Sequence, residues 1–194
     1  MKKKVPQTIP DIPQLEAELK RVQYRLRYKT VLRSTIYTLI TVAAVAVLVA
    51  TLWMPVLQIY GRSMTPTLSD GNIVVSVKTG DFHSGDIIAF YYNNKILIKR
   101  VIAGAGDWVD IEDDGTVYVN GEQLEEPYLT EKALGDCNIE MPYQVPESRL
   151  FVMGDHRSVS VDSRSTAVGC VAEEQIVGKI IFRVWPLNEF GKVE

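Results

Sequence analysis

Three polar segments of this chain carry residue types suited to hydrolysis. Ser63 lies in the turn-like stretch GRSMTPTL over 61–68, Lys99 lies in the apolar run 95–102, and charged and hydroxyl residues follow one another over 154–164. A serine hydroxyl becomes a nucleophile when a base takes its proton, and an uncharged lysine amine can be that base. Taken singly, each segment also has a plainer interpretation: a turn serine, an edge strand and a solvated loop.

The surroundings of Lys99 decide whether its amine could be uncharged. Strand alternation puts Leu97, Lys99 and Val101 on one face and Ile98, Arg100 and Ile102 on the other. Because both faces are largely apolar, a cation must point into dry surroundings. Lowering a lysine pKa from about 10.4 to about 7 costs the fold about 4 to 5 kcal/mol, and it leaves a neutral amine that could activate Ser63 without any histidine.

The elements that position these residues begin with an asymmetric charge distribution. Residues 1–33 carry nine Lys/Arg and three acidic residues, whereas residues 34–194 carry twelve and twenty-one. Between these parts, no charged residue occurs over 34–61. Such a run is long enough to cross a bilayer core of about 30 Å, and the preceding basic residues place the N-terminus in the cytoplasm. The positive charge is not spread over a folded face, so we expect no nucleic-acid partner.

We therefore predict three parts. A basic cytoplasmic segment with a short helix covers 1–33, a transmembrane signal anchor covers 34–59, and an extracytoplasmic domain covers 60–194. The basic segment is too long for a cleavable signal peptide, and no Ala-x-Ala site follows the apolar run. The short helix has two interpretations, a helix lying on anionic lipid or the stem of the span.

The sequence of the external part predicts a mostly β fold. Asp-Gly and Asn-Gly pairs at 114–115 and 120–121 are strong hairpin signals, and short β-type runs recur between such turns. The expected strands cover 72–77, 86–92, 95–103, 116–119, 149–153 and 177–185, with an extended connection over 125–146 and a helical turn over 172–175. The predicted fold class is a coiled antiparallel β-sheet domain on a single N-terminal transmembrane helix.

Taken together, the motifs over 61–68, 98–102 and 154–164 resemble those of the bacterial type I signal peptidases in order and spacing. The resemblance extends from the apolar run to Trp185. It implies a membrane-bound serine endopeptidase that removes signal peptides from exported preproteins with a Ser/Lys dyad on a mostly β fold. The sequence has no metal-ligand spacing, so we expect no metal and no cofactor. The expected partners are preproteins and the lipid bilayer. We expect a monomer.

The resemblance assigns a role to each matching position. Ser63 is the expected nucleophile and Lys99 the expected general base. The supporting residues are Ser160, which would orient the lysine amine, Asp162 and Arg164, which would form a structural ion pair, and Asp155 and Arg157, which would shape the loop.

Two positions depart from the family pattern. Some members have a serine hydroxyl as an oxyanion donor where this chain has Gly61, so the donor beside the Ser63 N–H would be a backbone group or water. His156 stands where the family commonly has Asn, and it allows an alternative triad of Ser63 and His156 with Asp155 or Asp162.

Sequence distance places the site close to the membrane. Ser63 lies six residues after Leu57, at most about 20 Å when fully extended. Tyr60 and Met64 could therefore contact lipid or substrate, and a substrate could bind as an added strand. Cys137 and Cys170 both lie in the external part, where they could form a disulfide or remain free thiols.

Two further functions fit the same features. One is a membrane-tethered binding or assembly protein that has a peptidase fold without turnover. The other is a specialised peptidase for pilin-like substrates.

Overall fold

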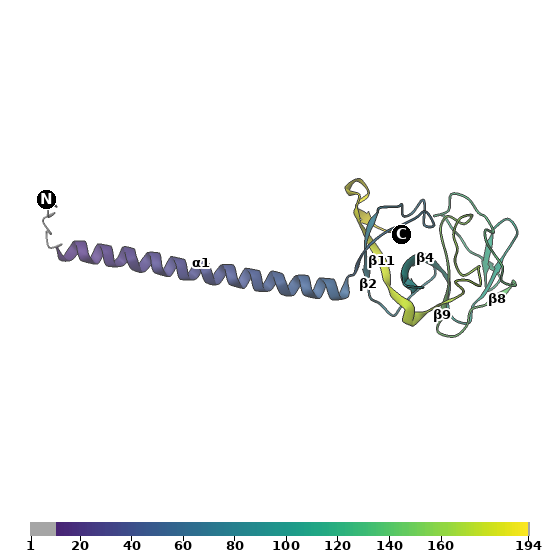
Figure 1. The fold of residues 1–194 in the computed structure, drawn as a ribbon, viewed down its shortest axis with the longest axis horizontal. Helices are drawn as coiled ribbons and strands as arrows, with labels where there is room; N and C mark the ends of the chain where they lie inside the picture. The colour runs from purple at the N-terminus through teal and green to yellow at the C-terminus, as the bar shows by residue number, and fades with distance from the viewer. Residues whose placement is uncertain (1–10, 194) are drawn as a thin grey trace. The chain divides into compact units, whose positions relative to one another are not determined.

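The computed structural model describes residues 11–193. The chain separates into two compact units, Met1–Val49 and Ala50–Glu194. The first is helical and the second is built from short antiparallel strands (Figure 1). The predicted fold class, mostly β with one N-terminal helix, is therefore confirmed.

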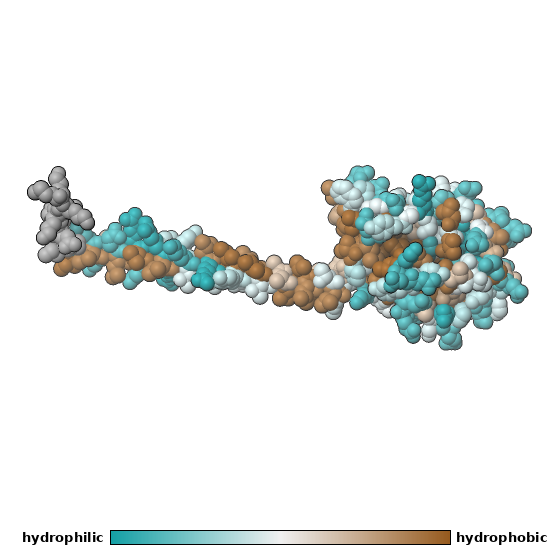
Figure 2. All heavy atoms as spheres, viewed as in Figure 1, coloured by the Kyte–Doolittle hydropathy of each residue, from teal (hydrophilic) through white to brown (hydrophobic). Residues whose placement is uncertain are grey.

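Helix α1 extends without a break from Ile12 to Trp53. The Asp11 carboxylate accepts the Ile12 N–H at 2.9 Å at its start, and Pro55, which cannot continue a helix, follows its end. Within the part that the structure describes, α1 is the one helix long and apolar enough to cross a membrane. Figure 2 shows hydrophilic residues along one side of its first half and largely hydrophobic or neutral residues along its second.

The end of α1 differs from the predicted end of the anchor. Residues 34–53 are helical, but strand β1 (Val56–Gln58) follows and pairs with β2 (Ile73–Val77). Residues 34–53 still measure about 30 Å at about 1.5 Å per residue. The described part of the basic segment continues into this same helix, which favours the stem over a helix lying on lipid.

The larger sheet has eight strands in the order β1-β2-β11-β3-β4-β9-β10, with β12 paired to β11. All its pairings are antiparallel. Its remaining strands are β3 (Ile87–Tyr92), β4 (Lys95–Ala103), β9 (Arg149–Met153), β10 (Val171–Ala172), β11 (Ile176–Trp185) and β12 (Gly191–Lys192). The pairings of β11 with both neighbours contain register shifts, which increase the local twist and help the sheet to coil.

The smaller sheet has four strands in the order β7-β6-β5-β8. They are β5 (Trp108–Ile111), β6 (Val117–Val119), β7 (Glu122–Gln123) and β8 (Tyr143–Gln144). Asn120 and Gly121 connect β6 to β7 with positive φ angles of 54° and 83°, as a tight hairpin turn requires. Both predicted hairpins are confirmed.

The predicted longer strands agree with the structure to within one residue at each end, and so does the helical turn, η1 (Glu173–Gln175). A second short 3₁₀ helix, η2, covers Leu187–Glu189. The strands that the sequence did not predict are mostly short ones.

Strand β3 shows how the core is arranged. Its residues Ile87 and Ala89 pack in one cluster with Met64, whereas Ile88 and Phe90 pack in another. Apolar side chains on both faces explain why β3 and β4 read as continuous hydrophobic runs. A third cluster joins β5 and β6 to β9, so the smaller sheet packs against the larger one.

Candidate active site

Ser63 lies in a turn that the core anchors. Met64 and Leu68 are buried and pack with Ile59 and Val74. The Leu68 N–H also donates to the Met64 carbonyl at 2.8 Å. Ser63 itself is half-buried, so the anchored neighbours hold its hydroxyl at the edge of the core.

Lys99 is enclosed in β4, with Ile88 opposite it on β3 and only 3% of its surface exposed. Burial is the main cause that lowers the pKa of Lys99 from 10.5 to about 8. The negative charges of Asp162 and Asp155 raise this pKa, and the positive charge of Arg164 lowers it. Within residues 11–193, neither the Lys99 ammonium nor the Ser63 hydroxyl forms a hydrogen bond or ion pair. Catalytic contacts often tighten only when substrate binds.

The loop after β9 contacts the surroundings of both residues. Its His156 N–H donates to the Ser63 carbonyl at 3.0 Å. The Gly154 N–H and the Ser160 hydroxyl donate to the same Asp162 oxygen, at 2.9 Å and 2.7 Å. A Cβ at Gly154 would overlap the Ser63 carbonyl and the Ser160 hydroxyl. The loop therefore touches the Ser63 turn and also holds the carboxylate whose charge acts on the lysine.

Asp162 and Arg164 form a buried ion pair. The Arg164 Nε and Nη2 atoms donate to the two carboxylate oxygens at 2.8 Å each. Burial by itself would raise the pKa of Asp162, but the hydrogen bonds and charge of Arg164 lower it below its ordinary value. Arg164 also donates to the Leu134 carbonyl at 2.6 Å, so the pair holds the 125–146 connection as well.

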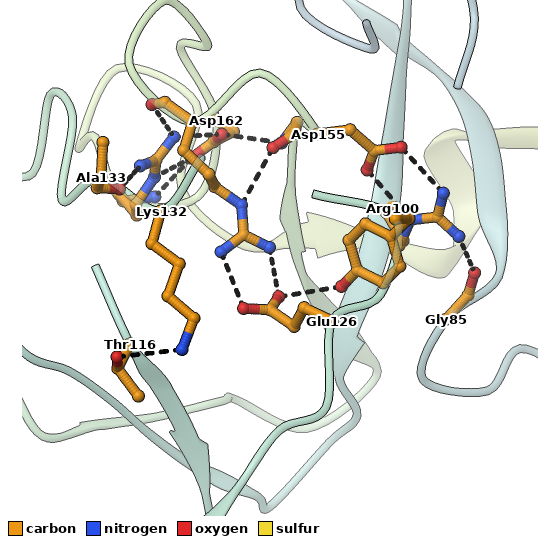
Figure 3. A network of polar contacts seen from close by, with 12 residues as sticks. Gly85, Arg100, Thr116, Glu126, Lys132, Ala133, Asp155 and Asp162 are labelled. Carbon is orange, nitrogen blue, oxygen red and sulfur yellow. Dashed lines mark hydrogen bonds and ion pairs between the residues drawn. The ribbon is translucent and has the colours of Figure 1, made fainter. Parts of the chain in front are cut away.

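A second buried pair joins β4 to the loop (Figure 3). Arg100 donates from Nε and Nη2 to the two Asp155 oxygens at 2.9 Å and 2.8 Å. The guanidinium carbon lies 3.8 Å from the centre of the Tyr128 ring, a cation–π contact. The Thr67 hydroxyl donates to Asp155 at 2.5 Å. Asp155 therefore links β4, the Ser63 turn and the loop.

A third pair joins the loop to the 125–146 connection. The side chains of Arg157 and Glu126 are each 1% exposed, and they form an ion pair. The Tyr128 hydroxyl donates to Glu126 at 2.8 Å, and Arg157 Nε donates to the Gly154 carbonyl at 3.1 Å. Asp155 and Arg157 are predicted near the site from the sequence, but their partners Arg100 and Glu126 are not. Arg100 could have been suspected from the sequence, because it is a charged residue next to Lys99 in an apolar strand. No comparable sequence feature indicates Glu126.

A cleft of about 810 Å³ adjoins Ser63. Mostly apolar residues line it, from two stretches that are far apart in the sequence: Leu57, Gln58, Ile59, Tyr60, Gly61, Ser63 and Met64, and Asn94, Lys95, Ile96, Leu97 and Ile98. Tyr60 is 80% exposed at this cleft, whereas Met64 is 2% exposed. The cleft can receive an extended apolar segment beside the serine.

The N–H of Gly61 has a partner within the turn. It donates to the Asp70 carboxylate at 2.7 Å, and Gly61 has a positive φ of 91°. A donor for the oxyanion, besides the Ser63 N–H, would therefore be another backbone group or water.

The ring of His156 is engaged away from the Ser63 hydroxyl. Its Nδ1 lies 2.9 Å from the Thr65 hydroxyl, and Asp155 and Asp162 are each paired with an arginine. In the described part of the chain, the alternative Ser-His-Asp triad is thus not formed.

The remaining candidate groups lie apart from this arrangement. His83 is exposed on the surface. Cys137 and Cys170 are free thiols, so the possible disulfide is not present. Residues 11–193 contain no cluster of three His, Cys, Asp or Glu side chains suited to a metal.

The sequence of this chain is similar to those of proteins named signal peptidases. The family model described as signal peptidase, peptidase S26, matches residues 32–185. Signal peptidase IB of Staphylococcus aureus (strain COL) is 42% identical over 153 residues, which cover 68% of this chain and 78% of that protein. Signal peptidase I of Bacillus licheniformis is 38% identical over 150 residues, which cover 69% and 78%. A crystal structure of a signal peptidase I from Enterococcus faecalis V583 has a TM-score of 0.42 and 31% identity, and the match covers 51% of this chain and 96% of that one.

Proposed function

This chain belongs to the S26 signal peptidase family and is a serine peptidase, a hydrolase of peptide bonds, and on that premise we propose that it removes signal peptides from exported preproteins with a Ser63/Lys99 dyad. The observation that carries the dyad is the burial of Lys99, which lowers the pKa of its amine to about 8. The strand that holds Lys99 is joined to the Ser63 turn through Asp155, which pairs with Arg100 and accepts a hydrogen bond from the Thr67 hydroxyl.

In the proposed reaction, the neutral Lys99 amine takes the proton of the Ser63 hydroxyl while the serine oxygen attacks the scissile carbonyl. The tetrahedral oxyanion accepts the Ser63 N–H. When the peptide C–N bond breaks, the leaving amine takes the proton from Lys99 and the signal peptide stays as an ester on Ser63. Lys99 then takes a proton from water while the water oxygen attacks the ester. When the ester C–O bond breaks, Lys99 gives this proton to the Ser63 oxygen, and the signal peptide leaves as an acid.

The supporting residues would hold this geometry. The hydrogen bond from Ser160 goes to Asp162, and Asp162 is fixed by Arg164 and Gly154. We propose that these groups set the position and electrostatic surroundings of the lysine, with Ser160 free to rotate toward the amine during the reaction.

Two walls of the apolar cleft, 57–64 and 94–98, would receive the end of the signal peptide as an added strand. Tyr60 and Met64 would contact the substrate there. The apolar lining suits small uncharged side chains just before the scissile bond.

We propose that α1 anchors the protein as a single-pass, monomeric enzyme of the bacterial cell membrane. Residues 1–33 would be cytoplasmic, since nine Lys/Arg precede the apolar run. The helical residues 34–53 would cross the bilayer, in place of the predicted 34–59, and the β unit that begins with β1 would lie outside the cytoplasm. The lipid bilayer is thereby a partner of the chain.

Cleavage of a purified preprotein by the detergent-solubilised full chain tests the proposal. The wild type should release the signal peptide, and Ser63→Ala and Lys99→Met should release none although they bind the preprotein. Binding by the wild type without any product would instead support the non-catalytic alternative. Cleavage confined to pilin-like preproteins would support the specialised peptidase.

A further inference from the structure

Three hydrogen bonds join the Ser63 turn to the loop over 154–157. The Ser63 carbonyl accepts the His156 N–H at 3.0 Å, the Thr65 hydroxyl lies 2.9 Å from His156 Nδ1, and the Thr67 hydroxyl reaches Asp155 at 2.5 Å. Every second residue of the turn is thus bound to the loop. His156 makes two of the three bonds, one with its backbone and one with its ring.

The direction of the ring bond follows from the single hydrogen of the Thr65 hydroxyl. That hydroxyl also lies 2.9 Å from the Arg62 carbonyl, which can only accept. Both contacts are hydrogen bonds only if the hydroxyl donates to Arg62 and the ring donates to the hydroxyl. His156 therefore carries its proton on Nδ1.

We propose that His156 is a positioning residue for the reaction: its Nδ1–H donates to Thr65 and so fixes the turn that presents the Ser63 hydroxyl and N–H. This inference rests on the proposed function of Ser63. The residues linked by the two contacts, Arg62 and Thr65, lie on either side of the nucleophile and its neighbour Met64. Locking both ends of this stretch limits how far the Ser63 hydroxyl can move from the line of attack.

The same requirement accounts for the residue type at this position. In His, Nδ1 is bonded to Cγ; in Asn, the amide nitrogen is also bonded to Cγ and also donates. An Asn at 156 could therefore make the same bond. Leu has a similar branch at Cγ but no donor.

The effect should fall on the chemical step rather than on substrate binding. Neither Thr65 nor His156 lines the apolar cleft beside Ser63. A neutral hydrogen bond contributes about 0.5 to 1.5 kcal/mol, so His156→Leu should lower kcat by roughly two- to twelvefold. KM should stay within about twofold.

The experiment measures kcat and KM for preprotein cleavage by the full chain in detergent, with His156→Leu, His156→Asn, Thr65→Val and the His156→Leu/Thr65→Val double variant. We expect His156→Asn to stay within about twofold of the wild type, and the double variant to lose no more than the worse single variant. His83→Asn, at an exposed histidine, is the matched control and should match the wild type. Thermal unfolding of every variant separates loss of the fold from loss of positioning.

Three results would overturn the inference. They are a kcat of His156→Leu equal to that of the wild type, a kcat of His156→Asn as low as that of His156→Leu, and fully additive losses in the double variant. The wild type and Ser63→Ala are run beside them. Should the wild type fail to cleave, the proposed function fails; if it cleaves and any of the three results is found, only the role of His156 fails.

Discussion

Lys99 has an ordinary side chain in unusual surroundings. Only 3% of its surface is exposed, and the effect of burial on its pKa outweighs that of the charges of Asp162 and Asp155. Holding an ammonium with a pKa lowered to about 8 costs the folded state roughly 3 kcal/mol near neutral pH, at about 1.36 kcal/mol per pKa unit. Such a cost is typical of functional residues rather than of residues that stabilise a fold.

The pH dependence of cleavage should follow this lysine. Because the neutral amine is the proposed base, kcat/KM should rise about tenfold per pH unit below about 8 and level off above it. Measurement of kcat/KM from pH 6 to pH 10 checks this. The exposed Lys78→Met variant should give the same profile, and Lys99→Met should show no cleavage at any pH. A profile that is flat between pH 6 and pH 9 would contradict the assignment.

At the scale of elements, the site depends on contacts between a turn, a strand and a loop that are distant in the sequence. At Gly154 the loop packs directly against the turn, since a Cβ there would overlap both Ser63 and Ser160. The 125–146 connection also contacts the loop. Its Glu126 pairs with Arg157, and its Leu134 carbonyl accepts a hydrogen bond from Arg164.

Gly154→Ala should therefore displace the nucleophile. A shift of about 1 Å costs about 100-fold in rate, so kcat should fall by about that factor. Gly178→Ala is the matched control, because its Cβ would meet the backbone of Val77, a residue of β2 that does not line the cleft beside Ser63. Both variants should lower the unfolding temperature, but only Gly154→Ala should lower kcat of the folded enzyme. Equal losses of kcat in the two would show that the effect is merely structural.

The pair of Glu126 and Arg157 should stabilise the fold only as a pair. Glu126→Ala leaves a buried, uncompensated arginine and should lower the free energy of unfolding by about 3 to 5 kcal/mol. The double variant Glu126→Gln/Arg157→Met removes both charges and should lose clearly less. Glu189→Ala breaks the more exposed pair with Arg183 and should cost less than about 1 kcal/mol. Chemical denaturation measures all three, and a double variant less stable than Glu126→Ala would refute the argument.

At the scale of the whole molecule, a basic, helical segment precedes an apolar one, and the β unit follows. The proposed topology separates these parts by a membrane, with the chemistry on the side opposite the basic residues. This arrangement would put the Ser63 turn near the surface from which a signal peptide emerges.

Labelling in intact spheroplasts tests that topology. In a Cys137→Ser background, a membrane-impermeant maleimide should label Glu122→Cys, which is exposed on the β unit, but not Glu18→Cys, which is exposed on the helix. Permeabilised cells should label both. Label on Glu18→Cys in intact spheroplasts would reverse the proposed orientation.

Local patterns determined much of this protein in advance. An uncharged apolar run specifies a helix, positive-φ pairs such as Asn120-Gly121 specify hairpins, and apolar runs specify strands buried on both faces, because each depends on near neighbours in the chain. The resemblance of three short motifs selected Ser63, Lys99 and Ser160 as candidates. None of these signals carried information on pairings across long distances in the sequence.

The tertiary structure decided which charges meet. Asp155 pairs with Arg100, 55 residues away, and Arg157 with Glu126, 31 residues away, and His156 bonds to Thr65 rather than to a carboxylate. The strand at Val56–Gln58 likewise forms because β2 offers it a partner, although its sequence reads as part of the span. A buried charge or an edge strand takes whatever partner the fold brings near it, and that choice is made by packing in three dimensions.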